Sequence, residues 1–483
     1  MRRIVLRGSA WRFWVREFVR TVHFVGIGGA GMSGIAAVLH DQGFKVSGSD
    51  IRRSSVTDWL TDRGVVVDIG HRAAQVMDAD AVVVSSAVSA DNPEIIAARR
   101  QGIPVLPRAQ MLGELMRFRR GIAVAGTHGK TTTTSLIAEI LLSAGLDPTF
   151  VVGGLVKSAQ GSARLGDGDY LVAEADESDS SFLHLHPLVA VITNIDADHL
   201  DAYDGDFDQL IRTFDEFLKR LPFYGLAILC ADDPVLQDLR KRLSNPVVTY
   251  GTGSDADYRA VDIRQEGRRM YFYLCMPGEP HVAVELALAG KHNVLNALAA
   301  VGIAHQLGVG LDPILKALAQ FQGVDRRFEV LGEVVIGRGK ALLVDDYAHH
   351  PTAIAATLDA ARNCWPERRR IVVFQPHRYT RTQALFDAFC DVLSSEAHLL
   401  ISDVYAAGES VIEDADGQSL CRAIASRTGI APTFVKDLSR LKDALAPILR
   451  PDDVVLTLGA GDIGRWVRTL LPAIGQSGMG AES

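Results

Sequence analysis

The sequence predicts an α/β protein of three successive blocks, each with a mostly parallel β-sheet flanked by helices. Short apolar, β-branched runs alternate with helical patterns along the chain, which is typical of doubly wound sheets. Two glycine-rich turns each connect such a strand to a helix. The length of 483 residues also exceeds what one ordinary hydrophobic core supports.

The composition excludes several classes of protein. Apolar residues make up 48% of the chain, so each block can bury a core. A formal net charge of −8 argues against a nucleic-acid binder. No apolar run is long enough to span a bilayer, so we expect no stable membrane insertion. The five scattered cysteines indicate reduced thiols in a cytoplasmic protein.

The two ends of the chain are expected to be poorly ordered. Residues 1–20 carry six arginines among aromatic residues, but their apolar stretch is too short for a signal-peptide core. The tail 476–483 is rich in glycine and serine.

The first block contains a glycine-rich turn. The strand 22–25 leads into Gly26–Gly31, which matches the pattern GxGxxG, and a helix follows over 32–39. The next strand, 45–49, ends at Asp50. Taken alone, this pattern favours a dinucleotide with Asp50 on a ribose hydroxyl, or a tight turn that binds nothing. Further strands are expected over 82–86 and 103–106.

The second block opens with a short phosphate loop. The strand 122–125 runs into Gly126-Thr127-His128-Gly129, and Lys130 and Thr131 then open a helix. Such a turn directs backbone N–H groups at phosphates, with the lysine near the terminal phosphates and the threonine hydroxyl near Mg²⁺. We therefore expect ATP at this loop.

Acidic residues follow two later strands of the same block. Glu174 ends the strand 170–174, and His199 lies in an acidic loop after the strand 189–193. Beside a phosphate loop, these residues are expected to hold Mg²⁺. As an isolated feature, either loop could equally be an ordinary solvated surface.

The third block is predicted to carry two polar loops at the carboxyl edge of its sheet. The segment 345–351 follows the strand 341–345, and the segment 375–381 follows the strand 371–374. Helices are expected over 352–363 and 382–394, and a last strand over 453–458. Arginines and histidines gathered at such an edge suit a small substrate that bears a carboxylate. The pair Arg326 and Arg327 lies at the hinge before this block, where one arginine could clamp a phosphate.

Two phosphate-binding turns in one chain favour an enzyme that uses ATP to join a nucleotide-carried substrate to another group. A hydride-transfer enzyme would not need the second turn.

With its motifs in order, the chain resembles the Mur ligases from about residue 21 to 470. The motifs that carry the resemblance are GIGGAGMSGIA, SGSD, GTHGKTTT, EADESD, TNIDADHLD, KHNVLNALAA, DRRFE, DDYAHHP, FQPHRYTR and GAGDIG.

The resemblance implies an N-terminal Rossmann-like UDP-binding domain, a central P-loop ATPase domain and a C-terminal Rossmann-like amino-acid-binding domain. We place these at 21–112, 113–323 and 324–475. It also implies that ATP phosphorylates the carboxylate of UDP-N-acetylmuramate and that the amine of L-alanine attacks the acyl phosphate. Such an enzyme serves peptidoglycan synthesis, and hence cell shape and division, in the bacterial cytoplasm, as a monomer or homodimer.

The resemblance further assigns residues to each ligand. For ATP they are Gly126, Thr127, His128, Gly129, Lys130, Thr131, Thr132, Asn293, Arg327 and Asp346. For the metal they are Thr131, Glu174 and His199. For the UDP-sugar they are Gly28, Gly29, Asp50, His71, Ser86 and Asn194. For the amino acid they are Tyr347, His349, His377, Arg378 and Arg381. The expected catalytic residues are Lys130, His199, Arg327 and His349, and the two histidines are candidates for the general base.

Three alternatives stay open at this point. A recycling ligase would add a ready-made murein tripeptide to the same nucleotide sugar, although that family is expected to lack the FQPHRYTR loop. An oxidoreductase would bind NAD at Gly26–Gly31. A non-catalytic sensor would bind both nucleotides without turnover.

Overall fold

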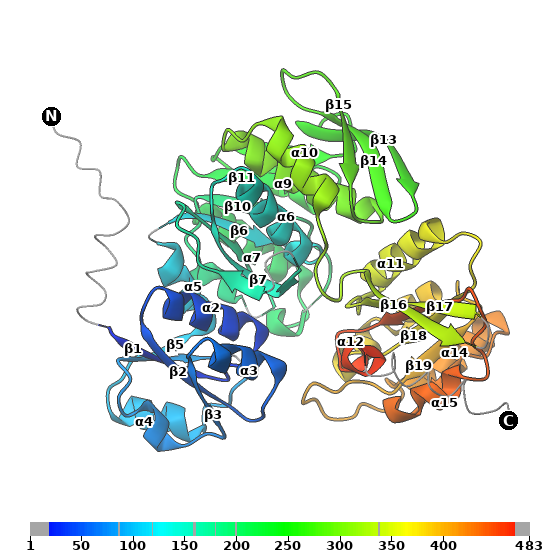
Figure 1. Ribbon diagram of the computed structural model, residues 1–483, viewed down its shortest axis with the longest axis horizontal. Coiled ribbons are helices and arrows are strands. Elements are labelled where there is room, and N and C mark those ends of the chain that lie inside the picture. The colour runs from blue at the N-terminus through cyan, green and yellow to red at the C-terminus, as the bar shows by residue number, and fades with distance from the viewer. Residues whose placement is uncertain are drawn as a thin grey trace. The chain divides into compact units, whose positions relative to one another are not determined.

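The computed structural model describes residues 19–468, apart from 86, 118, 158–160, 179, 199 and 337–338. The predictions for most of the N-terminal extension, for the tail 476–483, for Ser86 and for His199 therefore lie outside the described residues. The chain forms two compact units (Figure 1). The first contains residues up to 262, 272–286 and 294–322, and the second contains 263–271, 287–293 and the chain from 323 onward.

The N-terminal sheet of the first unit has five parallel strands in the order β3-β2-β1-β4-β5. The order reverses beside β1, and the glycine-rich turn follows β1 at that switch point. The strands are β1 (Thr21–Val25), β2 (Lys45–Asp50), β3 (Val66–Ile69), β4 (Ala81–Val84) and β5 (Val105–Pro107). The helices are α2 (Ala30–Asp41), α3 (Ser55–Asp62), α4 (Pro93–Arg100) and α5 (Arg108–Met116).

The central sheet has ten strands in the order β15-β14-β13-β12-β11-β10-β6-β9-β7-β8. Its middle strands pair in parallel, and β8 is antiparallel to β7. The strands are β6 (Arg120–Ala125), β7 (Thr149–Val156), β8 (Gly161–Arg164), β9 (Tyr170–Glu174), β10 (Val189–Ile192), β11 (Leu226–Cys230), β12 (Val247–Gly251), β13 (Tyr258–Glu266), β14 (Arg269–Cys275) and β15 (Val282–Leu286). The helices are α6 (Lys130–Ser143), α7 (Phe207–Lys219), α8 (Pro234–Arg240), α9 (Lys291–Gln306) and α10 (Leu311–Gln320).

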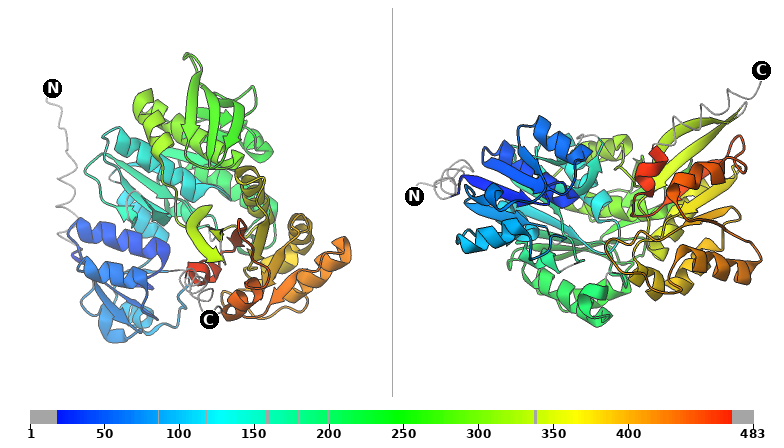
Figure 2. Two further views of the ribbon diagram at one scale, coloured as in Figure 1. Left: turned by 45° about the vertical axis from the view of Figure 1, so that its right-hand side comes forward. Right: turned by 90° about the horizontal axis from the view of Figure 1, so that it is seen from below.

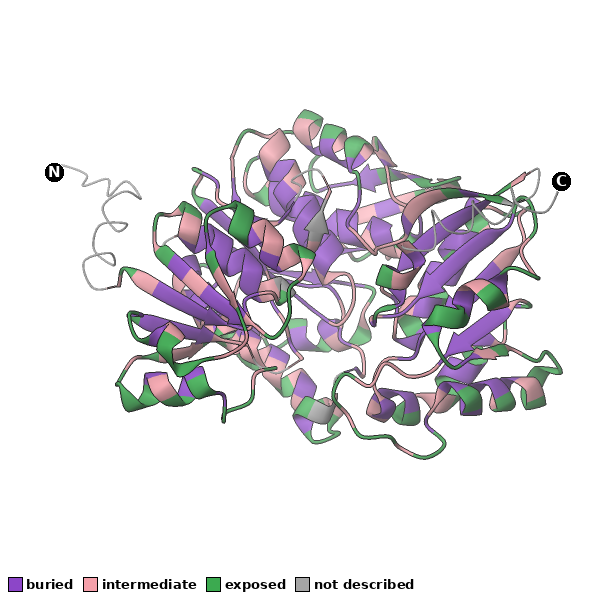
Figure 3. Cartoon of the chain, turned by 60° about the horizontal axis from the view of Figure 1, so that its bottom comes forward, coloured by how far each residue is buried: buried purple, intermediate pink, exposed green. Residues whose placement is uncertain are grey.

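The central strands are apolar on both faces because helices cover both sides. Residues 121–125 of β6 and all of β10 are buried. Figure 3 colours buried residues purple, and the strands of the sheets are mostly purple. Because β6 pairs in parallel with both β9 and β10, the carboxyl ends of these strands lie side by side. The loops that follow the three strands therefore gather at one edge of the sheet. This edge carries the phosphate loop.

The sheet of the second unit has the order β16-β17-β21-β18-β19-β20 and is parallel except for the hairpin β16–β17. Its residues are coloured from yellow-green to red in Figure 2. The strands are β16 (Glu329–Ile336), β17 (Gly339–Asp346), β18 (Arg370–Phe374), β19 (Leu399–Ser402), β20 (Thr433–Val435) and β21 (Val454–Leu458). The helices are α11 (Pro351–Cys364), α12 (Tyr379–Ala384), α13 (Phe386–Leu393), α14 (Gly417–Thr428) and α15 (Leu441–Leu445).

Alternate strand residues of this sheet pack into two separate cores. Val344 and Phe374 face one side with α11, α13 and α14, whereas Leu343 and Val373 face the other side with α15. The predicted mixed α/β class with mostly parallel sheets is confirmed. One expected helix differs, because the segment 382–394 breaks at Leu385, whose backbone leaves the helical region between α12 and α13.

Candidate active site

The phosphate loop requires glycine at both of its glycine positions. Gly126 has φ +123° and Gly129 has φ +83°, a region that side chains rarely adopt. A Cβ atom at Gly126 would lie 2.1 Å from Thr193 Oγ1, and one at Gly129 would lie 2.3 Å from Asn296 Oδ1. The loop is thus packed tightly against its neighbours while it opens α6.

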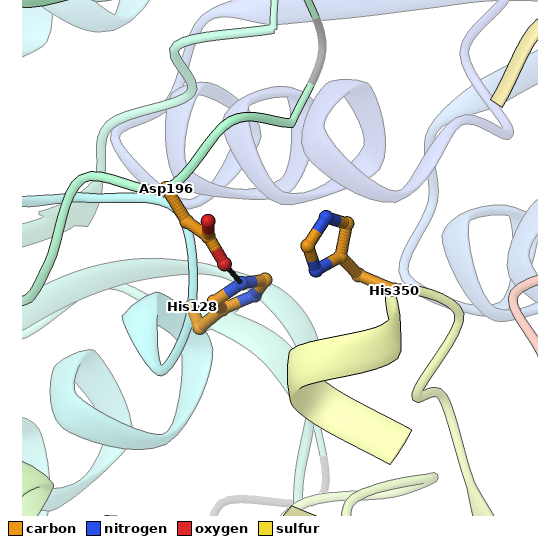
Figure 4. Close-up of side chains that lie close together, drawn as sticks. All are labelled: His128, Asp196 and His350. Atoms are coloured by element: carbon orange, nitrogen blue, oxygen red, sulfur yellow. Dashed lines mark hydrogen bonds and ion pairs between the residues drawn. The ribbon is translucent and has the colours of Figure 1, made fainter. Parts of the chain in front are cut away.

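Residues after β10 brace this loop. Asn194 accepts a hydrogen bond from the His128 backbone N–H at 2.8 Å and donates to the His128 carbonyl at 3.0 Å. The His128 ring places Nε2 3.0 Å from Asp196 Oδ2 (Figure 4). The Asp196 backbone N–H donates to the Thr127 hydroxyl at 2.9 Å. Asn194, which was expected at the UDP-sugar, therefore holds the loop backbone in this structure.

Lys130 is fixed at the first turn of α6 by four contacts. Its Nζ donates to the Gly126 carbonyl at 2.6 Å and lies 3.3 Å from the Thr127 carbonyl. It also donates to both carboxylate oxygens of Glu177, at 2.8 and 2.7 Å. The Glu177 side chain is 1% exposed, so this ion pair is buried. Glu177 was not among the residues expected at the site.

The charges of this pair depend on each other. Burial would lower the pKa of Lys130, but Glu177, Asp176 and Glu174 outweigh it and hold the pKa above its ordinary value. Burial raises the pKa of Glu177 to about 7, against the attraction of Lys130. Burial also opposes the ionisation of Asp176, yet Lys130 and the Ser178 N–H keep the pKa of Asp176 below its ordinary value. The lysine therefore stays charged.

A threonine hydroxyl and a carboxylate meet beside the loop. Thr131 Oγ1 donates to Glu174 Oε1 at 3.0 Å, and the Gly153 backbone N–H donates to Glu174 Oε2 at 2.8 Å. A hydroxyl and a carboxylate oxygen next to a phosphate loop are the hard oxygen ligands that Mg²⁺ prefers. Thr131 and Glu174 therefore fit a magnesium ion. Thr132, on the same turn, is buried.

The glycine-rich turn after β1 is tied to Asp50. The Gly28 backbone N–H donates to Asp50 Oδ2 at 2.9 Å, and a Cβ at Gly28 would lie 2.7 Å from this oxygen. Gly29 immediately precedes α2 with an extended backbone. His71 follows β3 at the same edge of the sheet, and its Nδ1 lies 3.0 Å from both Ser49 Oγ and Glu94 Oε2.

The second unit separates the roles of its two adjacent arginines. Arg326 has φ +59°, and its guanidinium donates to Asp345 at 3.2 Å and to the carbonyls of Gly459 and Gly461. Both arginines lie over the Tyr347 ring, each with its guanidinium carbon 5.0 Å from the ring centroid, but Arg326 also makes the hydrogen bonds named above. Arg326 therefore holds the fold of this unit.

Asp346 secures the same segment from the end of β17. Its two carboxylate oxygens accept from the Phe328 N–H at 2.6 Å and the Ala348 N–H at 2.7 Å. Burial raises the pKa of Asp346 to about 6, although Arg327 and both N–H donors lower it. Asn293 lies at the start of α9, where its side chain is buried and donates to the Ala289 carbonyl at 2.7 Å.

Aromatic and basic side chains gather at the carboxyl edge of the third sheet. The His349 ring lies 5.2 Å from the Tyr347 ring and 5.8 Å from the His377 ring. His377 stacks on Tyr405 at 5.5 Å, and Arg381 Nη1 is 3.2 Å from His377 Nδ1. The expected amino-acid residues Tyr347, His349, His377 and Arg381 therefore lie together.

Arg378 adopts φ +67° before α12, and its guanidinium lies 4.0 Å from Glu409.

The described residues include no helix that is long and apolar enough to cross a membrane.

Comparison with known proteins places the whole arrangement in one family. The Mur ligase catalytic-domain model matches residues 21–120, the Mur ligase middle-domain model matches 124–304, and the Mur ligase glutamate-ligase-domain model matches 326–461. The chain is 57% identical to a UDP-N-acetylmuramate–L-alanine ligase of Halorhodospira halophila over 446 residues, covering 92% of each chain. The chain belongs to the Mur ligase family.

Solved structures of Mur ligases share the fold. A UDP-N-acetylmuramate–alanine ligase from Thermotoga maritima matches with a TM-score of 0.81 and 30% identity, covering 95% of this chain and 99% of that one. A murein peptide ligase from Psychrobacter arcticus matches with a TM-score of 0.70 and 26% identity, covering 94% and 99%. Membership in a family of ligases gives no support to the oxidoreductase and sensor alternatives.

Two residues with functional contacts were missed from the sequence. Glu177 lies in the acidic run 174–179, in which Glu174 is the residue expected to bind the metal. Glu94 lies outside every motif that the sequence analysis uses. Only the pairing of distant strands shows that Glu94 reaches His71 and that Glu177 reaches Lys130.

Proposed function

We propose that this protein joins L-alanine to the muramate carboxylate of UDP-N-acetylmuramate at the expense of ATP. The relative that is 57% identical over 92% of both chains carries the name of that activity. The buried lysine at the phosphate loop and the basic, aromatic edge of the third sheet support the same chemistry. The products are UDP-N-acetylmuramoyl-L-alanine, ADP and phosphate.

The reaction runs in two transfers. A muramate carboxylate oxygen attacks the γ-phosphorus of ATP, the bond to the β-phosphate oxygen breaks, and ADP leaves. The alanine nitrogen then loses a proton and attacks the acyl carbon, and the tetrahedral intermediate expels phosphate to leave an amide. Lys130, and Arg327 from the second unit, neutralise the charge on the transferring phosphoryl group. His199 and His349 are candidates for the base that takes the ammonium proton.

Mg²⁺ is part of this proposal. Thr131 and Glu174 would hold one ion and His199 would serve a second, and the ions would neutralise phosphate charge when bound. The other ATP contacts come from Gly126, Thr127, His128, Gly129, Thr132, Asn293 and Asp346.

The two substrates divide between the other loops. Gly28, Gly29, Asp50, His71, Ser86 and Asn194 would meet the UDP-sugar. Tyr347, His349, His377, Arg378 and Arg381 would hold alanine, with arginine on its carboxylate.

The organisation and cellular setting complete the proposal. We assign the UDP-sugar domain to 21–112, the ATP domain to 113–323 and the amino-acid domain to 324–475. The protein acts in the bacterial cytoplasm, as a monomer or homodimer, and supplies the cell-wall precursor on which cell shape and division depend.

Phosphate release provides the test. Purified protein is incubated with ATP, Mg²⁺, UDP-N-acetylmuramate and each of the twenty amino acids in turn, and a murein tripeptide serves as a further acceptor. Phosphate should appear fastest with L-alanine and should require all three substrates. Turnover of ATP that ignores alanine, or a preference for the tripeptide, would overturn the proposal.

A further inference from the structure

A buried polar cluster lies beneath the carboxyl edge of the N-terminal sheet. It consists of His23 on β1, Ser49 on β2, His71 after β3 and Glu94 on α4. The side chains of Glu94 and His23 are 0% and 1% exposed, whereas that of His71 is 16% exposed. Only the histidine at the sheet edge therefore reaches toward solvent.

Glu94 is the centre of this cluster. Its Oε2 accepts from the Ser49 hydroxyl at 2.6 Å and lies 3.0 Å from His71 Nδ1. Its Oε1 lies 3.5 Å from His23 Nε2, and neither of these two buried atoms has a hydrogen-bond partner. The negative charge is thus buried and is compensated from three sides.

The ionisation of Glu94 decides which atoms of His71 carry hydrogen. Burial would raise the pKa of Glu94, but His23, Ser49 and His71 outweigh it and lower that pKa. An ionised carboxylate only accepts hydrogen bonds, so His71 Nδ1 must be the donor. The Nε2 atom, on the far side of the ring, is left for another partner.

The position of His71 indicates which part of a nucleotide it meets. In the order β3-β2-β1, the glycine-rich turn follows β1, Asp50 ends β2, and His71 follows β3. In open α/β sheets the turn after the first strand faces the diphosphate, and the acid at the end of the next strand faces the ribose. His71 lies one strand further out, on the nucleoside side.

We propose that Glu94 is a positioning residue that fixes the His71 ring so that Nε2 contacts the nucleoside of the UDP-sugar. The inference rests on the proposed function, because it needs a uridine nucleotide at this edge. There, the Nε2 atom accepts from the N3–H of uracil or from a ribose hydroxyl. Glu94 itself does not touch the substrate, since its side chain is fully buried.

The test compares Glu94→Gln, His71→Gln and the double variant in the full-length protein. Binding of UDP, UMP and UDP-N-acetylmuramate is measured by calorimetry, with a non-hydrolysable ATP analogue as a second ligand. Loss of the hydrogen bond between His71 and the nucleoside justifies an expected loss of about 3- to 10-fold in UDP affinity for each single variant. The double variant should be no weaker than the worse single variant, because both changes remove one contact.

The control is His23→Gln, which changes the neighbour of Glu94 Oε1, the carboxylate oxygen that does not contact His71. This variant should lower the melting temperature without weakening UDP binding. If it weakens UDP binding as much as Glu94→Gln does, the cluster acts by stability alone and the proposal is wrong. The affinity for the ATP analogue should stay unchanged in every variant.

The choice of nucleotide locates the contact. Equal losses for UMP and UDP support a nucleoside contact, whereas a loss confined to UDP would place His71 on the diphosphate and overturn this assignment.

Wild-type protein labelled with ¹⁵N-histidine gives a readout that does not depend on the folding of any variant. UDP should shift the His71 Nε2 resonance while Nδ1 stays protonated, and a protonated Nε2 beside an unprotonated Nδ1 would contradict the proposal. A wild-type protein that binds no uridine nucleotide would overturn the proposed function itself.

Discussion

Replacing Glu177 with glutamine should make the protein less stable and yet tighten its binding of Mg·ATP. In the structure, Lys130 donates to both oxygens of Glu177 at 2.7 and 2.8 Å, and both side chains are largely buried. Under the proposed function Lys130 turns toward the phosphates when ATP binds, so the glutamate competes with the nucleotide. Glutamine keeps one acceptor and loses the charge.

The magnitude follows from the contact that is lost. A hydrogen bond to a charged group contributes about 1.5–3 kcal/mol. Losing one of the two hydrogen bonds between Lys130 and Glu177 should destabilise the nucleotide-free protein by at least about 1.5 kcal/mol. Because the nucleotide-bound protein does not make this bond, the same free energy corresponds to about tenfold tighter binding of the nucleotide. The loss of a negative charge that repels the phosphates acts in the same direction.

Calorimetry with a non-hydrolysable ATP analogue measures the affinity, and thermal melts measure the stability with and without the analogue. Glu216→Gln is the matched control, because Glu216 lies on α7 and makes an ion pair at the surface with Arg220, the residue after that helix. Affinity that is unchanged or weaker in Glu177→Gln would refute the reasoning, since it would show that Glu177 contributes to the bound state.

Three further predictions follow from the same geometry. Titration in buffers of different ionisation enthalpy should reveal proton uptake near pH 7 when the analogue binds, and the uptake should vanish in Glu177→Gln. The sign follows because the pKa of Glu177 is about 7 with Lys130 alongside and rises further when Lys130 leaves it for the phosphates. Gly129→Ala should weaken ATP binding at least about tenfold, because its φ of +83° and the contact with Asn296 strain any side chain; unchanged affinity would contradict this. Arg326→Lys should lower the melting temperature, whereas Arg327→Lys should lower kcat/KM for ATP at a nearly constant melting temperature, and the reverse pattern would exchange the two roles.

The sequence predicts the framework of this protein because its signals are local. Apolar β-branched runs predict strands such as Tyr170–Glu174, and the glycines of the phosphate loop predict the strand–turn–helix unit that the structure contains. The break at Leu385 escapes such analysis, because the apolar periodicity continues across it. The partners of His71 and Lys130 escape it too, since Glu94 and Glu177 are 23 and 47 positions away along the chain. Contacts of this kind depend on which strands pair, and local patterns do not encode that choice.

Helix α2 has a consequence for substrate length. It begins at the glycine-rich turn and packs on β7 and β8 of the central sheet, where a Cβ at Gly34 would lie 3.1 Å from Ala163 Cβ. The Gly153 N–H of β7 in turn holds Glu174, which accepts from Thr131. Within the first unit, α2, β7 and Glu174 thus connect the turn proposed for the UDP-sugar to the loop proposed for ATP. A nucleotide sugar whose carboxylate stands a bond or two nearer to or farther from its diphosphate would bind at one end and miss the phosphorus at the other.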